Sequence, residues 1–443
     1  MSSSDITEAQ AYSVSPLEGR YKNILGDELK CFSEFNLMKM RVQVECEYYL
    51  FMLHLVKPGK MNCAIYESIH GIVDNFSFEE YKKIKQIEKE TNHDVKAVEY
   101  YLRTFDCFEF KSMIHYGLTS EDINSVSYAM IIHNFFSENI YDTLSSLCED
   151  IDKLARKCLY KTLSFTHGQP ATPKLMSDRL AVFIFRLNEL LEIEHKFSCK
   201  FGGSVGTLES HKLVYPEVDW DKQIQNFLEV FHPSLERQQY TTQIDNYDMM
   251  VRVFQTMMGF NAVMKDLCQD MWLLISKNYF KLVAKEGEVG SSAMPHKVNP
   301  IDFENAEGQL RIADALFGVL AGSMPVSFLE RDLSGSTMMR NVGVAFAHTV
   351  LAIKGIRRGL GKLEINLEVI QQDLTNNPQV LSEIVQNFMR SRDIDDSYEK
   401  VKEFTRGKVV TLQVFIEFID SLEELSDEDK VKLKEICNRY LVA

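Results

Sequence analysis

Proline is scarce in this chain, and its distribution restricts the fold more than any other feature. The 443 residues contain ten prolines, and none lies between Gly59 and Gln169, between Lys174 and Tyr215, or between Ser234 and Met294. Proline breaks helix interiors because it lacks a backbone N–H and its ring clashes with the preceding turn. Long proline-free stretches therefore leave room for helices of many turns, provided that their apolar residues are spaced for a helix.

Apolar side chains recur every three or four residues along two stretches, as expected for one face of a helix. We interpret the Met and Phe residues in them as core packing. Helices with such stripes pack nearly parallel, so we predict an all-α fold with a long-helix central bundle. The two series are Val253, Met257, Phe260, Val263 or Met264, Leu267, Met271 and Leu274, and Leu144, Leu147, Ile151, Leu154 and Cys158.

We expect three domains: a small helical N-terminal domain over residues 1–111, the bundle over 112–362, and a helical C-terminal domain over 363–443. Strand signals are weak, and no alternating run leads into a convincing hairpin turn. The GGSVG segment at Gly202–Gly206 is either a phosphate loop or a loop that closes one helix. It lacks GxGxxG spacing and a preceding strand, which favours the helix-closing loop.

The chain is acidic, with a formal net charge of −15. Such a surface repels nucleic acid and anionic lipid, so we expect neither as a partner. A small anionic substrate would need a local cluster of Arg, Lys and helix N-termini. No stretch approaches the roughly 20 apolar residues of a membrane span, and the first residues lack the basic and apolar regions of a signal peptide. We therefore expect a cytoplasmic protein.

The nine cysteines and eleven histidines are not arranged as disulfide or metal-binding patterns. There is no CxxC pair and no HExxH, and the cysteine count is odd. A disulfide framework or a zinc site needs clustered ligands. We predict reduced cysteines within helices, no structural metal and no cofactor.

Against this helical background, six short segments are too polar and too rich in Gly, Pro and Ser to be core. Such segments are typical of functional loops at the edges of a scaffold. They are GSSAMPHKVNP at Gly290–Pro300, THGQPATP at Thr166–Pro173, LTSEDIN at Leu118–Asn124, SPLEGRY at Ser15–Tyr21, TNHD at Thr91–Asp94, and ERDLSGSTMMRN at Glu330–Asn341.

Taken singly, each segment has a structural explanation. In LTSEDIN, Thr119 or Ser120 caps a helix and Asp122 is the capping-box partner. We place THGQPATP at a helix entrance, where its histidine is structural. The serines of GSSAMPHKVNP are loop hydroxyls, and the arginines of ERDLSGSTMMRN are solvated charges. The joint occurrence of all six favours function.

GSSAMPHKVNP resembles the signature of the fumarase/aspartase superfamily, GSSxMPxKxN. SPLEGRY, TNHDVKAVEYYL, TSEDIN, THGQPATP, YTTQI and MPHKVNPIDFENAEG resemble the adenylosuccinate lyase family in its bacterial form, over roughly Ser15 to Gly407. The resemblance implies a fumarase/aspartase-like fold, a homotetramer with sites built from three chains, and two reactions. These are cleavage of adenylosuccinate to AMP and fumarate, and the matching cleavage of the succinylated aminoimidazole carboxamide ribonucleotide in purine biosynthesis.

An anti elimination of this kind removes a weakly acidic proton beside a carboxylate, so positive charge and hydrogen-bond donors must meet the developing aci-carboxylate. The resemblance gives this role to Lys297 and Asn299, a cation and an amide on one loop. His167 suits protonation of the leaving nitrogen, because histidine titrates near neutral pH. The family motif makes Ser291 the base, activated as its loop closes; the residues alone do not distinguish it from Ser292.

The substrate carries a phosphate and two carboxylates, and arginine offers such anions a bidentate fork. By resemblance, the phosphate end falls to Arg20, Tyr21, Ser336 and Arg340. The nucleotide side falls to Asn92, His93 and Asp94, with His93 as an orienting group to which we assign no proton. The succinyl part falls to Thr119, Ser120, Gln243 and Arg331.

One inference about assembly comes from the chain itself, because neither Gly nor Pro lies between Leu118 and His167. A helix of about 40 residues would hold its ends roughly 60 Å apart. The two segments at those ends would then belong to one site only if neighbouring subunits pack antiparallel. A hairpin within residues 118–167 would remove this inference.

Two other functions remain open. One is a different fumarate-releasing lyase of the superfamily, such as argininosuccinate lyase or fumarase, against which TNHD, THGQP and PHKVNPIDFE argue. The other is a helical scaffold without catalysis. A scaffold would be expected to have lost His167, Ser291 or Lys297, and all three are present.

Overall fold

The computed structural model describes residues 7–283, 294, 296–332 and 334–442. Ser291, Ser292 and three further residues of GSSAMPHKVNP lie outside the described residues. The chain divides into two compact units. Unit 1 comprises Met1–Leu144, Leu190–Ala262 and Gly308–Ile353, and unit 2 comprises Ser145–Glu189, Val263–Glu307 and Lys354–Ala443. The three-domain division of the sequence is a different description of the chain and stays a prediction.

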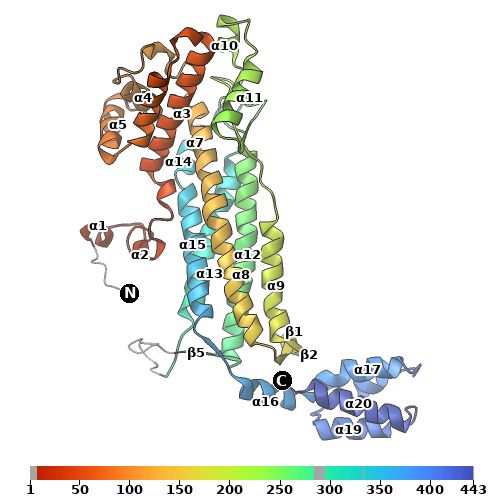
Figure 1. Cartoon of the computed structure of the whole chain (residues 1–443). Coiled ribbons are helices and arrows are strands. Elements are labelled where there is room, and N and C mark those ends of the chain that lie inside the picture. Colours follow the sequence, from red (N-terminus) through yellow and green to blue (C-terminus); the bar gives the residue numbers. More distant parts are fainter. Residues whose placement is uncertain (1–6, 284–293, 295, 333, 443) are drawn as a thin grey trace. The chain divides into compact units, whose positions relative to one another are not determined.

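The N-terminal part of unit 1 is a group of helices packed around α3 (Figure 1). Ser33, Asn62 and Ser77 cap helices α3, α4 and α5 with their side-chain oxygens, which explains where these helices begin. The elements are α1 (Glu8–Ala11), α2 (Lys22–Leu25), η1 (Lys30–Phe32), α3 (Glu34–Val56), η2 (Pro58–Lys60), α4 (Cys63–Asp74), α5 (Phe78–Thr91), α6 (Asp94–Leu102) and η3 (Lys111–Met113).

Long helices follow, and five of them have residues in both units. A chain of aromatic contacts joins four helices within unit 1. Phe317 of α13 lies 5.6 Å from Phe254 of α12 and 5.2 Å from Phe346 of α15, and Phe346 lies 5.2 Å from Phe135 of α7. The five are α8 (Tyr141–Lys157), α9 (Met176–Leu191), α12 (Asp248–Ser276), α13 (Ile301–Ser323) and α15 (Val342–Leu360).

Helix α7 (Ser120–Phe135) continues through the π-helical turn η4 (Phe136–Ile140) into α8 without an intervening loop. The interval from Ser120 to Lys157 therefore contains no hairpin. Every residue of the two predicted apolar series is buried, including both Val263 and Met264. The predicted mostly helical fold and its core stripes are confirmed.

The remaining elements of unit 1 are short and lie between α9 and α12 or after α13. Strands β3 and β4 pair in parallel, and α11 contacts β4. These elements are β3 (Phe197–Cys199), α10 (Glu209–Val214), α11 (Trp220–Phe231), β4 (Leu235–Arg237) and α14 (Gly335–Met339).

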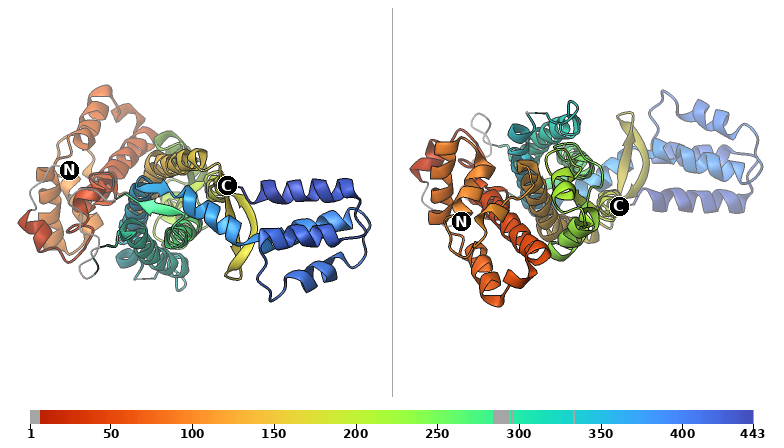
Figure 2. Two further views of the ribbon diagram at one scale, coloured as in Figure 1. Left: turned by 90° about the horizontal axis from the view of Figure 1, so that it is seen from below. Right: turned by 90° about the horizontal axis from the view of Figure 1, so that it is seen from above.

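Unit 2 carries two small sheets and the C-terminal helices, which pack side by side (Figure 2). Ion pairs cross-link its long helices, such as Arg357 to Asp150 at 2.7 Å and Arg186 to Asp266 at 2.5 Å. Its further elements are β1 (Lys161–Thr166), β2 (Gln169–Leu175), β5 (Phe280–Leu282), β6 (Leu363–Ile365), α16 (Leu367–Asn376), η5 (Pro378–Leu381), α17 (Ser382–Arg390), α18 (Ser397–Thr405), α19 (Leu412–Ser421) and α20 (Asp427–Tyr440).

Two sequence expectations were wrong. THGQPATP supplies the last residue of β1, the turn and most of β2 in the antiparallel hairpin β1–β2, although α9 does begin directly after β2. His167 and Gly168 make a two-residue turn in which both φ angles are positive, 53° and 72°, as a type I′ hairpin turn requires. Pro170 and Pro173 both lie in β2, where each strand of a two-stranded sheet has a free edge that tolerates proline.

The second error concerns GGSVG, which follows strand β3 and does not close a helix. Its Gly203 and Gly206 have φ angles of 74° and 80°. The backbone N–H groups of Gly202 and Gly203 donate to Oδ1 of Asp122 at 2.7 and 3.1 Å. The backbone of this segment does bind an anion, as a phosphate loop would, but the anion is the Asp122 carboxylate of the chain itself.

All nine cysteines are free. Within the described ranges, no helix is long and apolar enough to cross a membrane.

Candidate active site

A pocket of about 260 Å³ lies in unit 1 and gathers residues from widely separated parts of the sequence. Seven of the eleven predicted substrate-binding residues line it, although no two of the three segments that supply them are adjacent in sequence. The predicted residues are Asn92, His93, Asp94, Ser120, Arg331, Ser336 and Arg340, and the others are Arg41, Glu88, Glu121, Asn124, Tyr128, Tyr247 and Met339.

Asp94 is the charged centre of one wall. Its Oδ2 lies 2.9 Å from a terminal nitrogen of the buried Arg41 and 3.3 Å from one of Arg340. Burial alone would raise the pKa of Asp94, but the two guanidinium groups and the N–H of Val95 lower it below the ordinary value. The wall therefore holds two positive charges against one negative charge.

The turn between α5 and α6 supplies the polar groups beside Asp94. Asn92 ends α5 in the left-handed conformation, with φ 53°, which asparagine tolerates better than most residues. His93 caps α6, because its Nδ1 accepts the backbone N–H of Lys96 at 3.1 Å. A ring whose Nδ1 accepts carries its proton on Nε2, so the outer nitrogen of His93 is a donor.

The N-terminus of α7 forms another part of the site, and a capping box fixes it as predicted. Asp122 Oδ2 accepts the backbone N–H of Thr119 at 2.8 Å. The same carboxylate pairs with Lys200 Nζ at 2.8 Å, and both side chains are fully buried. Four donors therefore converge on Asp122, counting the two N–H groups of GGSVG, and they hold Ser120 at the pocket.

Gln243 and Arg331 are joined, because Arg331 Nη1 donates to Gln243 Oε1 at 3.4 Å. Among the described residues, no carboxylate lies within ion-pair distance of Arg331, so its charge is available to a ligand. Arg340 Nη1 donates to the backbone carbonyl of Ser336 at 3.1 Å, which fixes the guanidinium over that turn.

The sequence reading missed Arg41, Asn124, Glu121 and Tyr247. Arg41 interrupts the apolar helix α3 and donates to Asn124 at 2.9 Å as well as to Asp94. A charge within an apolar helix was the available signal for it. Burial raises the pKa of Glu121 to about 7, and its Oε1 accepts the hydroxyl of Tyr247 at 2.5 Å. No feature of TSEDIN by itself distinguishes this pocket glutamate from a surface one.

Arg20 and Tyr21 line neither the pocket described above nor the second cavity of unit 1. Arg20 is exposed and its guanidinium carbon lies 6.0 Å from the centre of the Tyr21 ring. Their neighbours Glu18 and Lys22 line a cavity of about 330 Å³ that is also lined by Arg340. Arg340 thus borders both cavities.

The predicted catalytic residues belong to unit 2. His167 is exposed at the tip of the β1–β2 hairpin. Lys297 is exposed, and its backbone N–H donates to Met294 at 3.1 Å. Asn299 is half-buried just before α13. None of the three lines the unit 1 pocket, and Ser291 lies outside the described residues, so their roles stay predictions.

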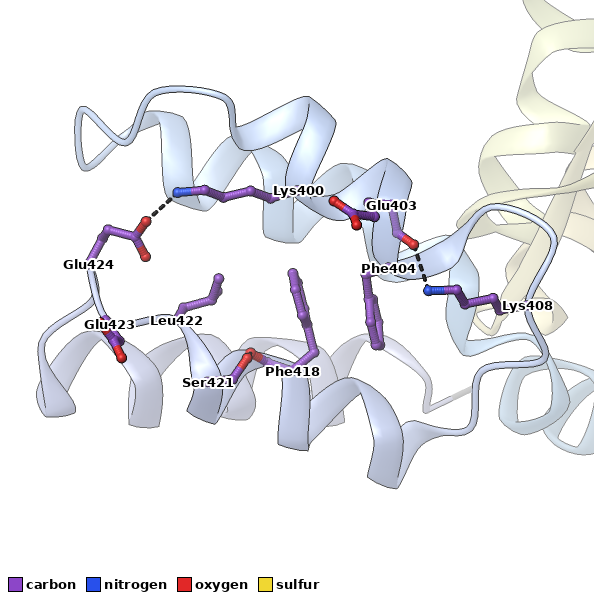
Figure 3. Close-up of a pocket in the computed structure, with 9 residues that line it drawn as sticks. All are labelled: Lys400, Glu403, Phe404, Lys408, Phe418, Ser421, Leu422, Glu423 and Glu424. Atoms are coloured by element: carbon purple, nitrogen blue, oxygen red, sulfur yellow. Dashed lines mark hydrogen bonds and ion pairs between the residues drawn. The ribbon is translucent and has the colours of Figure 1, made fainter.

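Another pocket, of about 530 Å³, lies among the C-terminal helices (Figure 3). Phe404 and Phe418 stack there with ring centres 4.1 Å apart. Lys400 pairs with Glu424, and Lys408 donates to the backbone carbonyl of Glu403 at 2.8 Å. Its lysines are engaged and it contains none of the predicted site residues, so the unit 1 pocket is the better candidate for anion binding.

Comparison with known proteins agrees with this assignment. A family model described as "Lyase" matches residues 30–313, and one described as "Adenylosuccinate lyase C-terminal" matches residues 327–441. An adenylosuccinate lyase of Dictyostelium discoideum is 41% identical, covering 95% of this chain and 94% of that protein. One from Escherichia coli strain K12 is 39% identical, with coverages of 95% and 94%.

Solved structures show the same fold at low sequence identity. A fumarate lyase from Mesorhizobium sp. BNC1 has a TM-score of 0.72 at 15% identity, covering 94% of this chain and 97% of that one. A 3-carboxy-cis,cis-muconate lactonizing enzyme from Pseudomonas putida has a TM-score of 0.69 at 16% identity, with coverages of 98% and 97%.

Proposed function

Because the chain belongs to the adenylosuccinate lyase family, we propose that it expels fumarate from adenylosuccinate to leave AMP, and from the succinylated aminoimidazole carboxamide ribonucleotide in purine biosynthesis. One observation carries this proposal beyond the family relationship. A protein of net charge −15 gathers two arginines on Asp94 and keeps Arg331 unpaired by any described carboxylate in a single pocket. Such a local excess of positive charge suits a substrate with several anionic groups.

We propose that the substrate spans the two cavities bordered by Arg340. Arg340, Ser336, Arg20 and Tyr21 would hold the phosphate. The nucleotide would lie along Asn92, His93 and Asp94. The succinyl carboxylates would meet Thr119, Ser120, Gln243 and Arg331, where the N-terminus of α7 adds its partial positive charge.

The elimination itself would use the unit 2 residues. Ser291 would remove the proton beside the carboxylate, and Lys297 with Asn299 would stabilise the aci-carboxylate that forms. His167 would protonate the leaving nitrogen, a contribution of roughly 10²–10⁴-fold for a positioned general acid. No cofactor enters this scheme.

We propose a homotetramer with active sites shared between subunits, acting in the cytoplasm. The unbroken run from Ser120 to Lys157 supports the sharing, since it removes the hairpin that would have undone the geometric inference. Exposed apolar side chains along the long helices support self-association, because such surfaces mark protein interfaces. They include Phe185 on α9, Trp272 and Leu273 on α12, and Ile312 and Val319 on α13. Nine free cysteines suit a reducing compartment.

The activity is tested by following adenylosuccinate cleavage by absorbance. Turnover is expected on both succinylated nucleotides and not on argininosuccinate or malate. Zero turnover on both, with AMP still bound tightly, would favour the scaffold function instead.

Site sharing is tested by mixing His167→Ala and Ser291→Ala proteins. Each alone is expected to be inactive, and the mixture should recover part of the activity, because some sites would regain both groups. Each variant mixed with itself is the control. Absence of recovery after demonstrated subunit exchange would contradict sharing.

A further inference from the structure

Glu121 is a carboxyl group placed where an anionic substrate should find only cations and donors. Glu121 lines the pocket beside Ser120 and Asn124, in the first turn of α7. It is 8% exposed. Oε1 accepts the Tyr247 hydroxyl, whereas Oε2 has no hydrogen-bond partner within the described part of the chain. A buried carboxylate without a direct ion pair is costly, and the usual relief is to take up a proton.

Among the described residues, no cation forms an ion pair with Glu121, although the charges of Lys200 and Arg331 both lower its pKa. Lys200 is already neutralised by Asp122. Asp245 is a second buried carboxyl group near Glu121. It accepts hydrogen bonds from the Ser125 hydroxyl, the Gln238 amide and the backbone N–H of Tyr247. The groups that face or approach Glu121 are Tyr247 and Asp245 from the segment before α12, Lys200 after β3, Arg331 before α14, Tyr128 on α7, and the Arg41–Asp94–Arg340 cluster across the pocket.

We propose that Glu121 binds the substrate as a neutral carboxylic acid, whose Oε2–H donates to a carboxylate of the succinyl group, so that binding takes up one proton from water above neutral pH. The proposal rests on the proposed function for the identity of that ligand. Ser120, adjacent in sequence, already belongs to the proposed succinyl subsite, so the donor stands where the acceptor is needed.

The titration of Glu121 agrees with this geometry. Burial raises its pKa to about 7 from the ordinary 4.5. Asp245 raises it further, whereas the Tyr247 hydroxyl and the charges of Lys200 and Arg331 lower it without offsetting burial. In the free enzyme the acid form then falls to about a tenth at pH 8 and a hundredth at pH 9. Apparent affinity scales with the competent fraction. Substrate affinity should accordingly weaken about 50-fold between pH 7 and pH 9 through this group.

The test compares Glu121→Gln with the unmodified enzyme. Glutamine keeps a carbonyl for Tyr247 and an N–H for the ligand, but it does not titrate. The ratio of kcat/KM, variant over unmodified, cancels the titration of every other group. It should rise about 50-fold from pH 7 to pH 9. A constant ratio overturns the proposal, as does a folded variant that fails to bind at every pH.

Tyr247→Phe provides a second, opposite test. It removes the hydrogen bond that favours the carboxylate form, so the alkaline loss of kcat/KM should move to higher pH; movement to lower pH contradicts the proposal. Glu99→Gln is the matched control, because Glu99 is 2% exposed, pairs with Lys96 and Arg103, and does not line the pocket. Its profile should match that of the unmodified enzyme.

Ligand binding separates this proposal from the proposed function. AMP has no carboxylate, so Glu121→Gln should leave the pH dependence of its affinity unchanged. When fumarate is titrated calorimetrically into the unmodified protein at pH 8, its binding should be accompanied by uptake of close to one proton. Binding to Glu121→Gln should be accompanied by close to none. If no fumarate is released from adenylosuccinate, the function fails. If fumarate is released but uptake is equal in both proteins, only the role of Glu121 fails.

Discussion

Replacing Asp122 with Asn tests how much one buried ion pair contributes to the fold and to the pocket. The carboxylate accepts from four donors, the backbone N–H groups of Thr119, Gly202 and Gly203 and the ammonium of Lys200. Asparagine offers one oxygen and one NH₂ group, so at least one of these donors must face another donor. Lys200 would also keep its charge with only the carbonyl of Gly203 as a partner.

The expected loss is large because both side chains of the pair are fully buried. Removing one partner of such a pair costs about 3–5 kcal/mol, chiefly because the other charge stays buried without compensation. The change should also raise KM, since the Asp122 carboxylate holds the Thr119–Ser120 turn against GGSVG. A lowered kcat alone, without a change in KM, is not expected.

Urea unfolding at one fixed protein concentration measures the loss. Asp27→Asn is the matched control, because Asp27 pairs with Lys30 at the same 2.8 Å but with side chains 80% and 71% exposed. Exposed pairs contribute about 0–1 kcal/mol. Adding Lys200→Met to Asp122→Asn removes the stranded charge and should restore part of the stability. A loss below about 1 kcal/mol for Asp122→Asn, or no gain in the double variant, would refute the reasoning.

Three further outcomes are expected. Gly117→Ala should destabilise the protein by about 2–4 kcal/mol in urea unfolding, because φ of Gly117 is 67° and the new Cβ would lie 2.3 Å from the buried His211 ring. Gly168→Ala is the control: Gly168 has φ 72° but open space around it, so the change should cost about 1 kcal/mol. Equal losses in the two variants would contradict the steric explanation. Glu121→Gln should gain stability relative to the unmodified protein as pH rises. The pKa of Glu121 is raised from 4.5 to about 7 in the fold, so its contribution to stability falls as pH rises between those values, and the gain of the variant should reach about 3 kcal/mol at pH 8 relative to pH 4. A pH-independent difference in thermal or urea unfolding would contradict this. Arg331→Gln should raise KM for adenylosuccinate by about 10–100-fold, the value of one charge-assisted hydrogen bond, with an unchanged KM as the contrary result.

Local sequence chemistry predicted those parts of the molecule that local physics decides. The apolar spacing from Val253 to Leu274 requires a helix whatever surrounds it, and all of those stripe residues are buried. The Thr119–Asp122 capping box likewise forms as the sequence indicates. The β1–β2 hairpin was missed because His167 and Gly168 adopt positive φ without an Asn-Gly or Asp-Gly signal.

Residues whose importance comes from tertiary contacts could not be predicted in the same way. Glu121 and Asp122 are adjacent acids in one helical turn, yet the fold gives one of them four donors and the other a single phenol. The order of the two residues in the sequence does not determine which of them forms the ion pair with Lys200. That difference arises only when GGSVG, more than 70 residues away in sequence, packs against α7.

The anion preference of an acidic protein follows from the same local distribution of partners. At physiological ionic strength, charges more than about 8 Å apart across solvent are largely screened, so most of the net charge of −15 contributes little inside the pocket. What matters there is which acids are neutralised. Asp122 is satisfied by Lys200 and backbone donors, Asp94 is outnumbered by Arg41 and Arg340, and Glu121 is held near the neutral form by burial. Glu88, the third carboxyl group that lines the pocket, pairs with Lys85 at 2.6 Å. These acids therefore do not make the pocket negative, and the charge of Arg331 is left to select an anion.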